Sequence, residues 1–350
     1  MTDTTLEELG WRPAFFQSLD LDRDSLDDLA RISAVHRDGY EALSPQGELR
    51  LRPMPAELTD EDRATVGDWV VIDRALERPA RILARQSLFS RKAPGTARGT
   101  QLIAANVDTA FIVTSCNEDF SLPRLERYLA LVREAGAFAV IVLTKMDLAA
   151  APDRFVDEAK TVAADTPIEV LDARDAGASG RLAEWLGQHQ TLALLGSSGV
   201  GKTTLLNGLT GRADAVSDIR DDDAKGRHTT RTRFMRPLLA GGWAIDLPGM
   251  RELGLANASD GLDATFADIV QTAEACRFKD CRHESEPGCA VREAIDAGEL
   301  DAERLARFRK LEREIERNDA TLAERRAKLK DFAKMVRSTQ SQRWAHRNKT

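Results

Sequence analysis

The stretch Gly196-Ser197-Ser198-Gly199-Val200-Gly201-Lys202-Thr203 matches the phosphate-binding P-loop pattern at every position. It follows the apolar run 192–195 and leads through Thr204 into an apolar helix, which is the strand–loop–helix context that the pattern requires. In such a loop the glycines let successive backbone N–H groups point at phosphate oxygens. We therefore expect residues 196–204 to bind a nucleoside triphosphate, with Lys202 on the β- and γ-phosphates and the Thr203 hydroxyl on Mg²⁺.

The P-loop lies within a long region of alternating strand and helix patterns that begins at about residue 101. Apolar runs predict strands over 107–115, 139–143, 168–171 and 191–195. Amphipathic patterns predict helices over 124–135, 152–164 and 180–186, and from residue 202 onward. This alternation predicts an α/β domain with a mostly parallel sheet and crossover helices.

Two motifs after the P-loop complete the phosphate end of a switch GTPase. Asp246 and Gly249 form an Asp-x-x-Gly motif at a strand end, where the aspartate can bind Mg²⁺ through water and the glycine N–H can meet a γ-phosphate. Between the P-loop and this Asp-x-x-Gly motif, His228-Thr229-Thr230 is flanked by basic residues, and either threonine would complete the Mg²⁺ shell with Thr203. This order of motifs describes a switch GTPase rather than a generic ATPase.

A base-reading motif precedes the P-loop. Thr144-Lys145-Met146-Asp147 directly follows an apolar strand, so the Asp147 carboxylate can face the N1–H and amine of guanine while the Lys145 stem packs on the ring. Thr144 replaces the commoner asparagine, and we expect this to remove an amide that braces the loop. In Asp172-Ala173-Arg174, the Ala173 backbone N–H is the candidate donor to guanine O6, although Asp172 departs from the usual serine.

Three of the four cysteines crowd into a short segment with one histidine. Cys276, Cys281, His283 and Cys289 offer three thiolates and one imidazole, a closed tetrahedral set without a vacant catalytic position. We expect one structural Zn²⁺ here, with an iron–sulfur cluster as the minor alternative. The remaining Cys116 lies in the α/β region and is expected to be a small buried side chain.

Composition and charge exclude several classes of protein. The chain of 350 residues is 42% hydrophobic and 31% charged, which is ordinary for globular domains. No apolar run is long enough for a membrane span, and the N-terminus does not have the pattern of a signal peptide, so we expect a cytoplasmic protein. The net charge is −7, yet residues 301–350 and the segment 78–98 are basic. Such basic islands on an acidic body can orient a polyanion.

Short strand patterns precede the α/β region. Period-two alternation predicts strands at 31–35, 40–43, 48–51, 68–72 and 81–83. Five such strands suggest a small closed barrel of the OB type, although other small β-domains fit the pattern nearly as well. After about residue 262 the sequence is helical and charged, which is typical of a C-terminal bundle or of an RNA-binding helix.

The order base motif, P-loop, threonine loop and Asp-x-x-Gly resembles that of the circularly permuted GTPases, specifically the bacterial ribosome small-subunit-dependent GTPase A family. The likeness runs over about residues 30–315, and the departures from the family pattern are Thr144, Asp172 and Arg231. It is carried further by Val66-Gly67-Asp68-Trp69-Val70, Ala104-Ala105-Asn106-Val107-Asp108, Gly226-Arg227-His228-Thr229-Thr230, Cys276-Arg277-Phe278-Lys279-Asp280-Cys281-Arg282-His283 and Glu286-Pro287-Gly288-Cys289-Ala290-Val291.

The resemblance implies four regions and a function. We expect an N-terminal extension (1–30), an OB-fold domain (31–95), a circularly permuted P-loop GTPase domain (96–260) and a zinc-binding helical domain (261–350). The family likeness implies GTP hydrolysis in late maturation of the small (30S) ribosomal subunit. The GTP form would bind the subunit and its rRNA as a monomer and leave after ribosome-stimulated hydrolysis.

The residue after Gly249 bears on the mechanism. Many switch GTPases carry a glutamine there to orient the attacking water, whereas Met250 cannot hydrogen-bond to water. His228 is the candidate to place the water, and its alternative role is packing or RNA contact. Two rival functions stay open at this stage: a nucleotide-gated RNA-binding adaptor with negligible turnover, and an ATP-dependent nucleic-acid remodeller, which the motif 144–147 disfavours.

Overall fold

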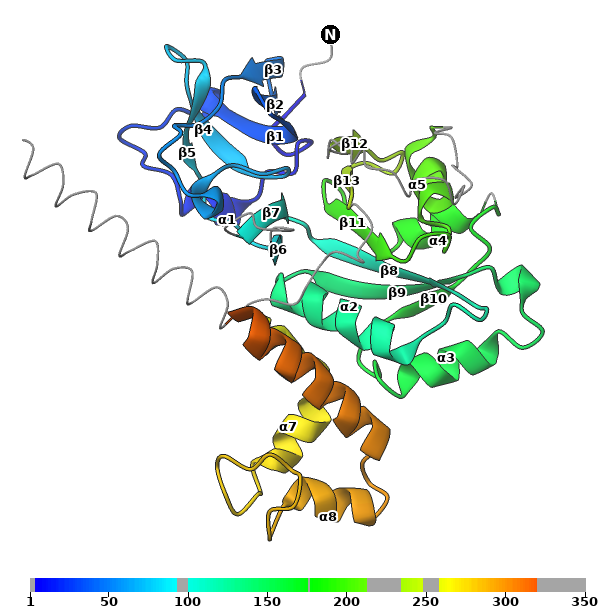
Figure 1. The fold of residues 1–350 in the computed structure, drawn as a ribbon. Helices are drawn as coiled ribbons and strands as arrows, with labels where there is room; N and C mark the ends of the chain where they lie inside the picture. Colours follow the sequence, from blue (N-terminus) through cyan, green and yellow to red (C-terminus); the bar gives the residue numbers. More distant parts are fainter. Residues whose placement is uncertain (1–3, 93–99, 176, 213–233, 248–257, 320–350) are drawn as a thin grey trace, which may run out of the picture.

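The computed structural model describes residues 4–92, 100–175, 177–212, 234–247 and 258–319. Within them, an N-terminal sheet, a central α/β layer structure and a group of C-terminal helices follow one another (Figure 1). No helix in these ranges combines the length and the apolar character needed to span a membrane.

The N-terminal sheet is antiparallel and has the strand order β3-β2-β1-β4-β5. Its strands lie where period-two alternation predicts them: β1 (Leu29–His36), β2 (Gly39–Ser44), β3 (Gly47–Leu51), β4 (Trp69–Asp73) and β5 (Arg78–Ile82). Alternate side chains, among them Ile32 and Val70, are fully buried on one face of the sheet. Near the two edge strands, the backbone N–H of Arg52 donates to the carbonyl oxygen of Glu77. This OB-like sheet confirms the expected class of N-terminal fold.

The segment before this sheet covers its second face. It contains α1 (Pro13–Phe16) and the short 3₁₀ turn η1 (Leu26–Asp28). Another 3₁₀ turn, η2 (Asp60–Asp62), lies later in the chain, between β3 and β4. The ring centroids of Trp11 and Phe15 lie 4.9 and 6.1 Å from that of the fully buried Trp69. Aromatic packing therefore holds the N-terminal segment to the sheet.

The central sheet has the order β10-β9-β8-β11-β13-β12 and is parallel except for β12. Its strands are β8 (Thr109–Ser115), β9 (Phe138–Thr144), β10 (Ile168–Val170), β11 (Thr191–Gly196), β12 (Met235–Pro237) and β13 (Trp243–Asp246). A hairpin of β6 (Leu88–Lys92) and β7 (Thr100–Ala105) leads into it. The parallel strands bring the carboxyl ends of β9, β10, β11 and β13 to one edge, which is where α/β sheets bind ligands.

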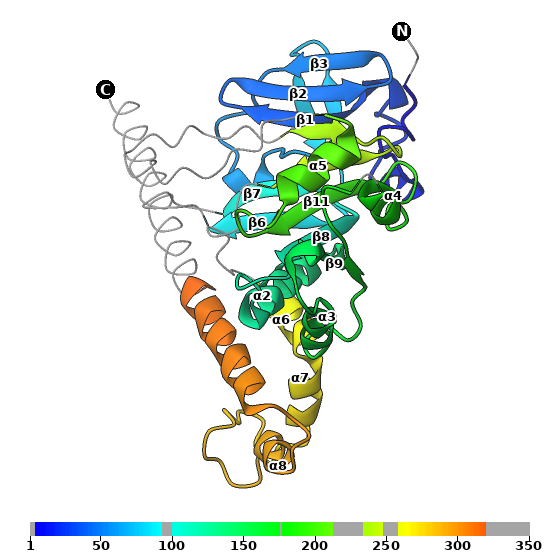
Figure 2. The ribbon, with the colours of Figure 1, turned by 90° about the vertical axis from the view of Figure 1, so that its right-hand side faces the viewer.

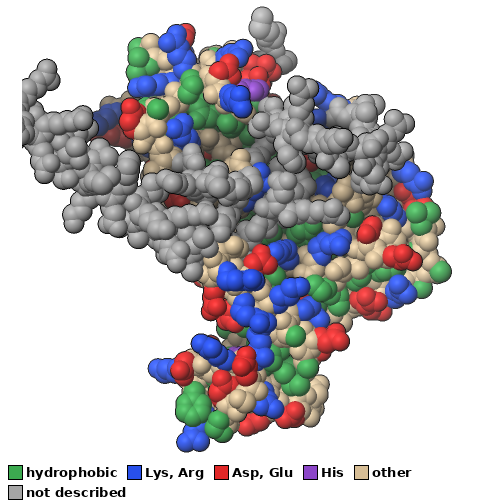
Figure 3. All heavy atoms as spheres, in the orientation of Figure 1, with side chains coloured by type: hydrophobic (Ala, Val, Ile, Leu, Met, Phe, Trp, Pro, Cys, Tyr) green, Lys and Arg blue, Asp and Glu red, His purple; other side chains and the backbone are tan. Residues whose placement is uncertain are grey.

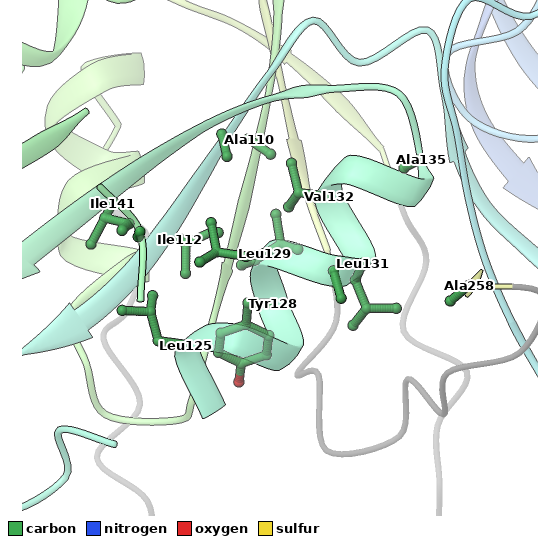
Figure 4. Packing of buried hydrophobic residues seen from close by; sticks show 14 of the residues in the cluster. Ala110, Ile112, Leu125, Tyr128, Leu129, Leu131, Val132, Ala135, Ile141 and Ala258 are labelled. Atoms are coloured by element: carbon green, nitrogen blue, oxygen red, sulfur yellow. The ribbon is translucent and has the colours of Figure 1, made fainter. Parts of the chain in front are cut away.

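Helices cover both faces of the central sheet, as expected for a mostly parallel sheet. Figure 4 shows α2 (Leu122–Glu134) laying Leu125 and Leu129 against Ile112 and Ile141 of β8 and β9. On that side α2 also packs against α3 (Asp153–Lys160), which follows the 3₁₀ turn η3 (Met146–Leu148). The opposite face buries Phe111 and its neighbours against α4 (Ala178–Ala183) and α5 (Lys202–Thr210).

The C-terminal helices contact α2 through the first and the last of them. They are α6 (Ser259–Thr265), α7 (Ala267–Ala273), α8 (Ala290–Asp296) and a helix over residues 302–319, called here the C-terminal helix. Figures 1 and 2 show the C-terminal helix, in orange, running beside α2. Gly261 lies so close to α2 that a Cβ there would stand 2.1 Å from the Ala130 carbonyl oxygen.

One buried arginine joins the N-terminal sheet to the central sheet. Arg31 on β1 is 1% exposed and donates to the Leu9 carbonyl at 2.6 Å and to the Thr191 hydroxyl at 2.6 Å. It also donates to the carbonyl oxygens of Gly67 and Asn106 at 3.3 Å. Since Thr191 begins β11, this single guanidinium connects the OB-like sheet to the strand that leads to the P-loop.

Part of the basic segment 78–98 serves the fold rather than a partner. Arg81 forms an ion pair with Asp24, and Nε and Nη2 of Arg85 each donate at 2.8 Å to the carboxylate of the fully buried Asp68. The guanidinium groups of these two arginines are therefore engaged in contacts within the chain.

Candidate nucleotide site and metal cluster

The P-loop connects the end of β11 to the start of α5. Gly196 has a φ of +151°, and a Cβ there would lie 2.2 Å from the Val113 carbonyl oxygen of the neighbouring strand. Gly201 has a φ of +100° and immediately precedes α5. Only glycine tolerates these conformations and this close approach, so the glycine spacing of the motif is a steric requirement of the turn.

Lys202 folds back over the loop from the first turn of α5. Its Nζ donates to the carbonyl oxygens of Gly196 at 2.9 Å and Ser197 at 2.6 Å. Burial lowers the pKa of Lys202, whereas the nearby carboxylate of Asp246 acts to raise it. Thr203 and Thr204 follow on the same turn, with Thr203 exposed. The predicted phosphate ligands thus gather where the N-terminus of α5 meets the loop.

The base motif touches the P-loop directly. Thr144 ends β9, is fully buried, and its Oγ1 lies 2.6 Å from the Val200 carbonyl oxygen and 3.2 Å from that of Thr114. The loop lacks the asparagine amide, as the sequence indicates, and a threonine hydroxyl forms a hydrogen bond in its place. The hydroxyl takes that role, because it can donate to the P-loop carbonyl from across the end of β8.

Asp147 lies at the same sheet edge but is already paired. Lys145 adopts a left-handed conformation with φ +57°, and Met146 is 37% exposed. The Asp147 carboxylate accepts from Arg174 at 2.6 Å, and Arg174 also binds the Asp172 carboxylate at 3.0 Å. Hydrogen bonds from Arg174 lower the pKa of Asp172. The sequence analysis missed this pairing, because Asp147 lies 27 positions before Arg174 in the chain.

Ala173 and the strand end at Asp246 complete the described part of the site. A Cβ placed on Gly201 would lie 3.7 Å from both the Ala173 Cβ and the Thr144 hydroxyl, so the loop 172–174 stands beside the P-loop. Asp246 ends β13, which pairs with β11. The remaining predicted residues, namely His228, Thr229, Thr230 and Gly249, lie outside the described residues, as does Met250.

A second neighbour of the P-loop also escaped the sequence analysis. The Arg124 guanidinium on α2 donates to the Ser197 hydroxyl at 2.8 Å, and the Tyr128 hydroxyl lies 3.5 Å from the same atom. Arg124 is 73 positions away from Ser197 in the chain, and no motif connects them.

The four predicted metal ligands converge. The ligand atoms of Cys276, Cys281, His283 and Cys289 all lie within 4.8 Å of one another. His283 Nδ1 is 3.6 and 3.4 Å from the sulfurs of Cys276 and Cys289, which are 4.0 Å apart. Tetrahedral Zn²⁺ with bonds of about 2.1 to 2.3 Å needs ligand atoms about 3.5 to 3.8 Å apart. Burial lowers the pKa of His283, favouring the neutral imidazole that binds metals.

Comparison with known proteins identifies the family. The sequence pattern described as RsgA GTPase matches residues 82–256. A protein named small ribosomal subunit biogenesis GTPase RsgA 2, from Vibrio vulnificus, is 46% identical over 338 residues, covering 96% of this chain and 95% of that protein. The chain belongs to the RsgA GTPase family.

Two further comparisons agree with this membership. The protein from Mesorhizobium japonicum named small ribosomal subunit biogenesis GTPase RsgA is 46% identical over 318 residues, which are 90% of this chain and 91% of that one. Among solved structures, YjeQ from Thermotoga maritima superposes with a TM-score of 0.59 over 81% of this chain and 96% of its own, at 22% identity. YloQ, described as a circularly permuted GTPase, superposes with a TM-score of 0.58 over 82% of this chain and 94% of its own, at 24% identity.

These findings confirm the fold expected for an RsgA GTPase. The base motif precedes the P-loop in the chain, and both stand at one edge of a single sheet. Family membership also confirms the expected enzyme class, a GTPase.

Proposed function

We propose that this chain hydrolyses GTP during late maturation of the small ribosomal subunit. In this proposal the GTP form binds the 30S subunit and its rRNA, and hydrolysis stimulated by the subunit releases the protein. The observation that carries the GTP-dependent part is the 2.6 Å contact between the Thr144 hydroxyl and the Val200 carbonyl, which connects the base motif to the P-loop. The names of the Vibrio and Mesorhizobium relatives support the ribosomal part.

The described residues divide into a base end and a phosphate end. Asp147 would read the guanine edge, with the Lys145 stem on the ring and the Ala173 N–H on O6. Lys202 would leave the loop carbonyls for the β- and γ-phosphates, while residues 196–201 present their N–H groups. Mg²⁺, which supplies charge neutralisation at the phosphates, would be held by Thr203 with Thr229 or Thr230, and Asp246 would act through water.

The metal cluster would hold one Zn²⁺ through Cys276, Cys281, His283 and Cys289. The three thiolates and one imidazole close the tetrahedron, so the metal would stabilise the C-terminal helices rather than act on substrate. The four regions expected from the sequence (1–30, 31–95, 96–260 and 261–350) remain our proposed domain division.

Positive charge supports a polyanionic partner. Figure 3 shows Lys and Arg side chains gathering over the C-terminal helix and α2 on one face of the molecule. Lys310, Arg313 and Arg317 are exposed on that helix. Since rRNA is a polyanion, such a face suits contact with a ribosomal particle better than with a small neutral ligand. We propose that the protein acts in the cytoplasm as a monomer.

The test is cosedimentation of the protein with small subunits in the presence of a non-hydrolysable GTP analogue or GDP, combined with phosphate release. The proposal is supported if the protein cosediments with small subunits in the presence of the analogue, does not cosediment with GDP, and hydrolyses GTP faster when subunits are present. Retention without turnover identifies the nucleotide-gated adaptor instead, and equal affinity for ATP and GTP would remove the guanine assignment.

A further inference from the structure

One helix, α2, contacts both the P-loop and the C-terminal helix. At its beginning, Arg124 donates to the Ser197 hydroxyl at 2.8 Å and to the Asp119 carbonyl at 3.3 Å. Ser197 is held at two points, because its carbonyl oxygen accepts from Lys202 at 2.6 Å. The Arg124 guanidinium therefore fixes the side chain of the same residue whose carbonyl anchors the phosphate-binding lysine.

Two residues further along, α2 carries a fully buried carboxylate. Glu126 is 0% exposed and accepts from Arg304 at 3.0 Å and from Arg307 at 2.7 Å, both on the C-terminal helix. Arg304 also binds the Asp268 carboxylate of α7 at 2.7 Å and lies over the Phe266 ring. A buried carboxylate with two hydrogen-bonded arginines fixes the relative position of the two helices, since Glu126 would lose both of its counter-charges if they separated.

A third contact reinforces this junction. Arg127 donates from Nη1 to both carboxylate oxygens of Glu314 at 3.1 Å, about two turns beyond Arg307 on the C-terminal helix. The exposed fractions of these side chains are 26% and 25%, so the pair is partly shielded from water. The C-terminal helix is thus held against α2 at several points, while the same turn of α2 presents Arg124 and Tyr128 to the P-loop.

We propose that Arg124 is a positioning residue for the P-loop, and that α2 couples the C-terminal helix to nucleotide binding through it. A displacement of the C-terminal helix would move α2, and with α2 the guanidinium that holds Ser197. The metal-binding region, which lies between α7 and the C-terminal helix in the chain, would therefore influence nucleotide affinity without touching the nucleotide. This inference rests on the proposed nucleotide site at the P-loop.

The first test is a double-mutant cycle read by the dissociation constant of a fluorescent GDP analogue. Arg124→Ala and Ser197→Ala should each weaken binding about tenfold, as expected for loss of a charge-assisted hydrogen bond. The double variant should be no weaker than either single variant, because both remove the same contact. Arg124→Lys, which keeps a donor, should recover most of the affinity. Arg154→Ala, which removes an exposed arginine from α3, is the control and should bind like the wild type.

Two results would overturn the positioning role: wild-type affinity in Arg124→Ala, or single effects that multiply in the double variant.

The second test addresses the coupling between the C-terminal helix and nucleotide binding. Arg307→Gln should weaken GDP binding several-fold in the wild-type background and should have no further effect in the Arg124→Ala background. An equal effect in both backgrounds would show that Arg307 acts by another route and would refute coupling through Arg124.

Two controls keep these outcomes distinct. Thermal unfolding followed by circular dichroism establishes that each variant is folded, and Arg307→Lys replaces Arg307→Gln if the latter does not fold. Lys202→Ala is the reference for the site itself. If the wild type binds guanine nucleotide as poorly as Lys202→Ala does, the proposed function fails. If Lys202→Ala loses affinity while Arg124→Ala binds like the wild type, only the inference fails.

Discussion

Thr144, the first residue of the proposed base motif, forms a hydrogen bond to the P-loop through its hydroxyl. Its side chain is fully buried, and it reaches the Val200 carbonyl at 2.6 Å because β9 and β11 are separated only by β8. The hydroxyl satisfies a P-loop carbonyl that would otherwise lack this partner. Loss of such a partner costs about 1 to 3 kcal/mol for a buried group.

Removal of this hydroxyl should weaken nucleotide binding. Thr144→Val keeps the branched shape but cannot donate, so we expect GTP affinity to fall by about tenfold, the equivalent of about 1.4 kcal/mol. Equilibrium titration with a fluorescent GTP analogue measures the effect. Thr144→Ser, which retains the hydroxyl, is the matched control and should stay close to wild type. Equal affinities of the valine and serine variants would mean that the hydrogen bond does not support the site.

Asp147 is the second residue at which a specific outcome is expected. Asp147→Asn replaces one acceptor facing the exocyclic amine of guanine by a donor, so preference should shift from GTP toward xanthosine triphosphate. Competition between the two nucleotides measures this shift. Arg181→Ala, which disrupts an exposed ion pair with Glu169 on the same domain, is the control. Unchanged GTP affinity in a folded Asp147→Asn protein would remove Asp147 from the base site.

At the scale of elements, the loop between α7 and α8 is organised around its ligand set. The segment gathers three sulfurs and one imidazole within 4.8 Å of one another. Closed sites of this kind contribute their binding free energy to local folding. The stability of the C-terminal helices should therefore depend on metal.

Metal analysis should return one equivalent of zinc. Chelation should increase hydrogen exchange in residues 262–319 and leave GTP binding measurable, because the ligands are remote in sequence from the P-loop. Hydrogen exchange followed by mass spectrometry, with and without chelator, measures the first effect, and exchange in β1 to β5 provides the internal control. The assignment would not survive an absence of zinc or the presence of iron in its place.

At the scale of the whole molecule, the three parts of the fold are tied to one α/β sheet. Arg31 connects the OB-like sheet to Thr191 at the start of β11, and Glu126 connects α2 to the C-terminal helix. The first contact lies at the start of β11, the strand that leads into the P-loop, and the second lies two residues from Arg124 on α2. A large particle that engages both outer parts would thereby act on the central sheet as well.

Small ribosomal subunits should raise the kcat of GTP hydrolysis by at least an order of magnitude. Met250 cannot orient water, so basal hydrolysis should be slow, and groups supplied by a partner are worth about 10³ to 10⁵ in trans-activated GTPases. Single-turnover kinetics at saturating subunits separates binding from chemistry. If His228 places the water, His228→Ala should lose most of the stimulation while still binding nucleotide and subunits. Normal stimulation of that variant would exclude the role of His228 and leave Arg227, Thr229 and Arg231 as candidates.

The sequence by itself determined the local chemistry. The P-loop at 196–203, the base motif at 144–147 and the ligand set from Cys276 to Cys289 each lie within a short window, so residue type and spacing are sufficient to recognise them. Period-two alternation predicted the strands of the N-terminal sheet, and apolar runs predicted β8 to β11 of the central sheet, whose strands are buried on both faces. The order of the motifs indicated the permuted fold, which the comparisons confirm.

Only the tertiary structure decided which distant residues serve these motifs. Thr144 and Val200 are 56 positions apart, Arg124 and Ser197 are 73 apart, Arg31 and Thr191 are 160 apart, and Glu126 and Arg304 are 178 apart. Such contacts have no periodicity, because they depend on strand order, on the rotation of α2 about its axis and on how the C-terminal helix packs on it. The chemistry of the site is local in the sequence, whereas its support arises from packing, where a polar group is bound by whichever partner the fold brings within about 3 Å.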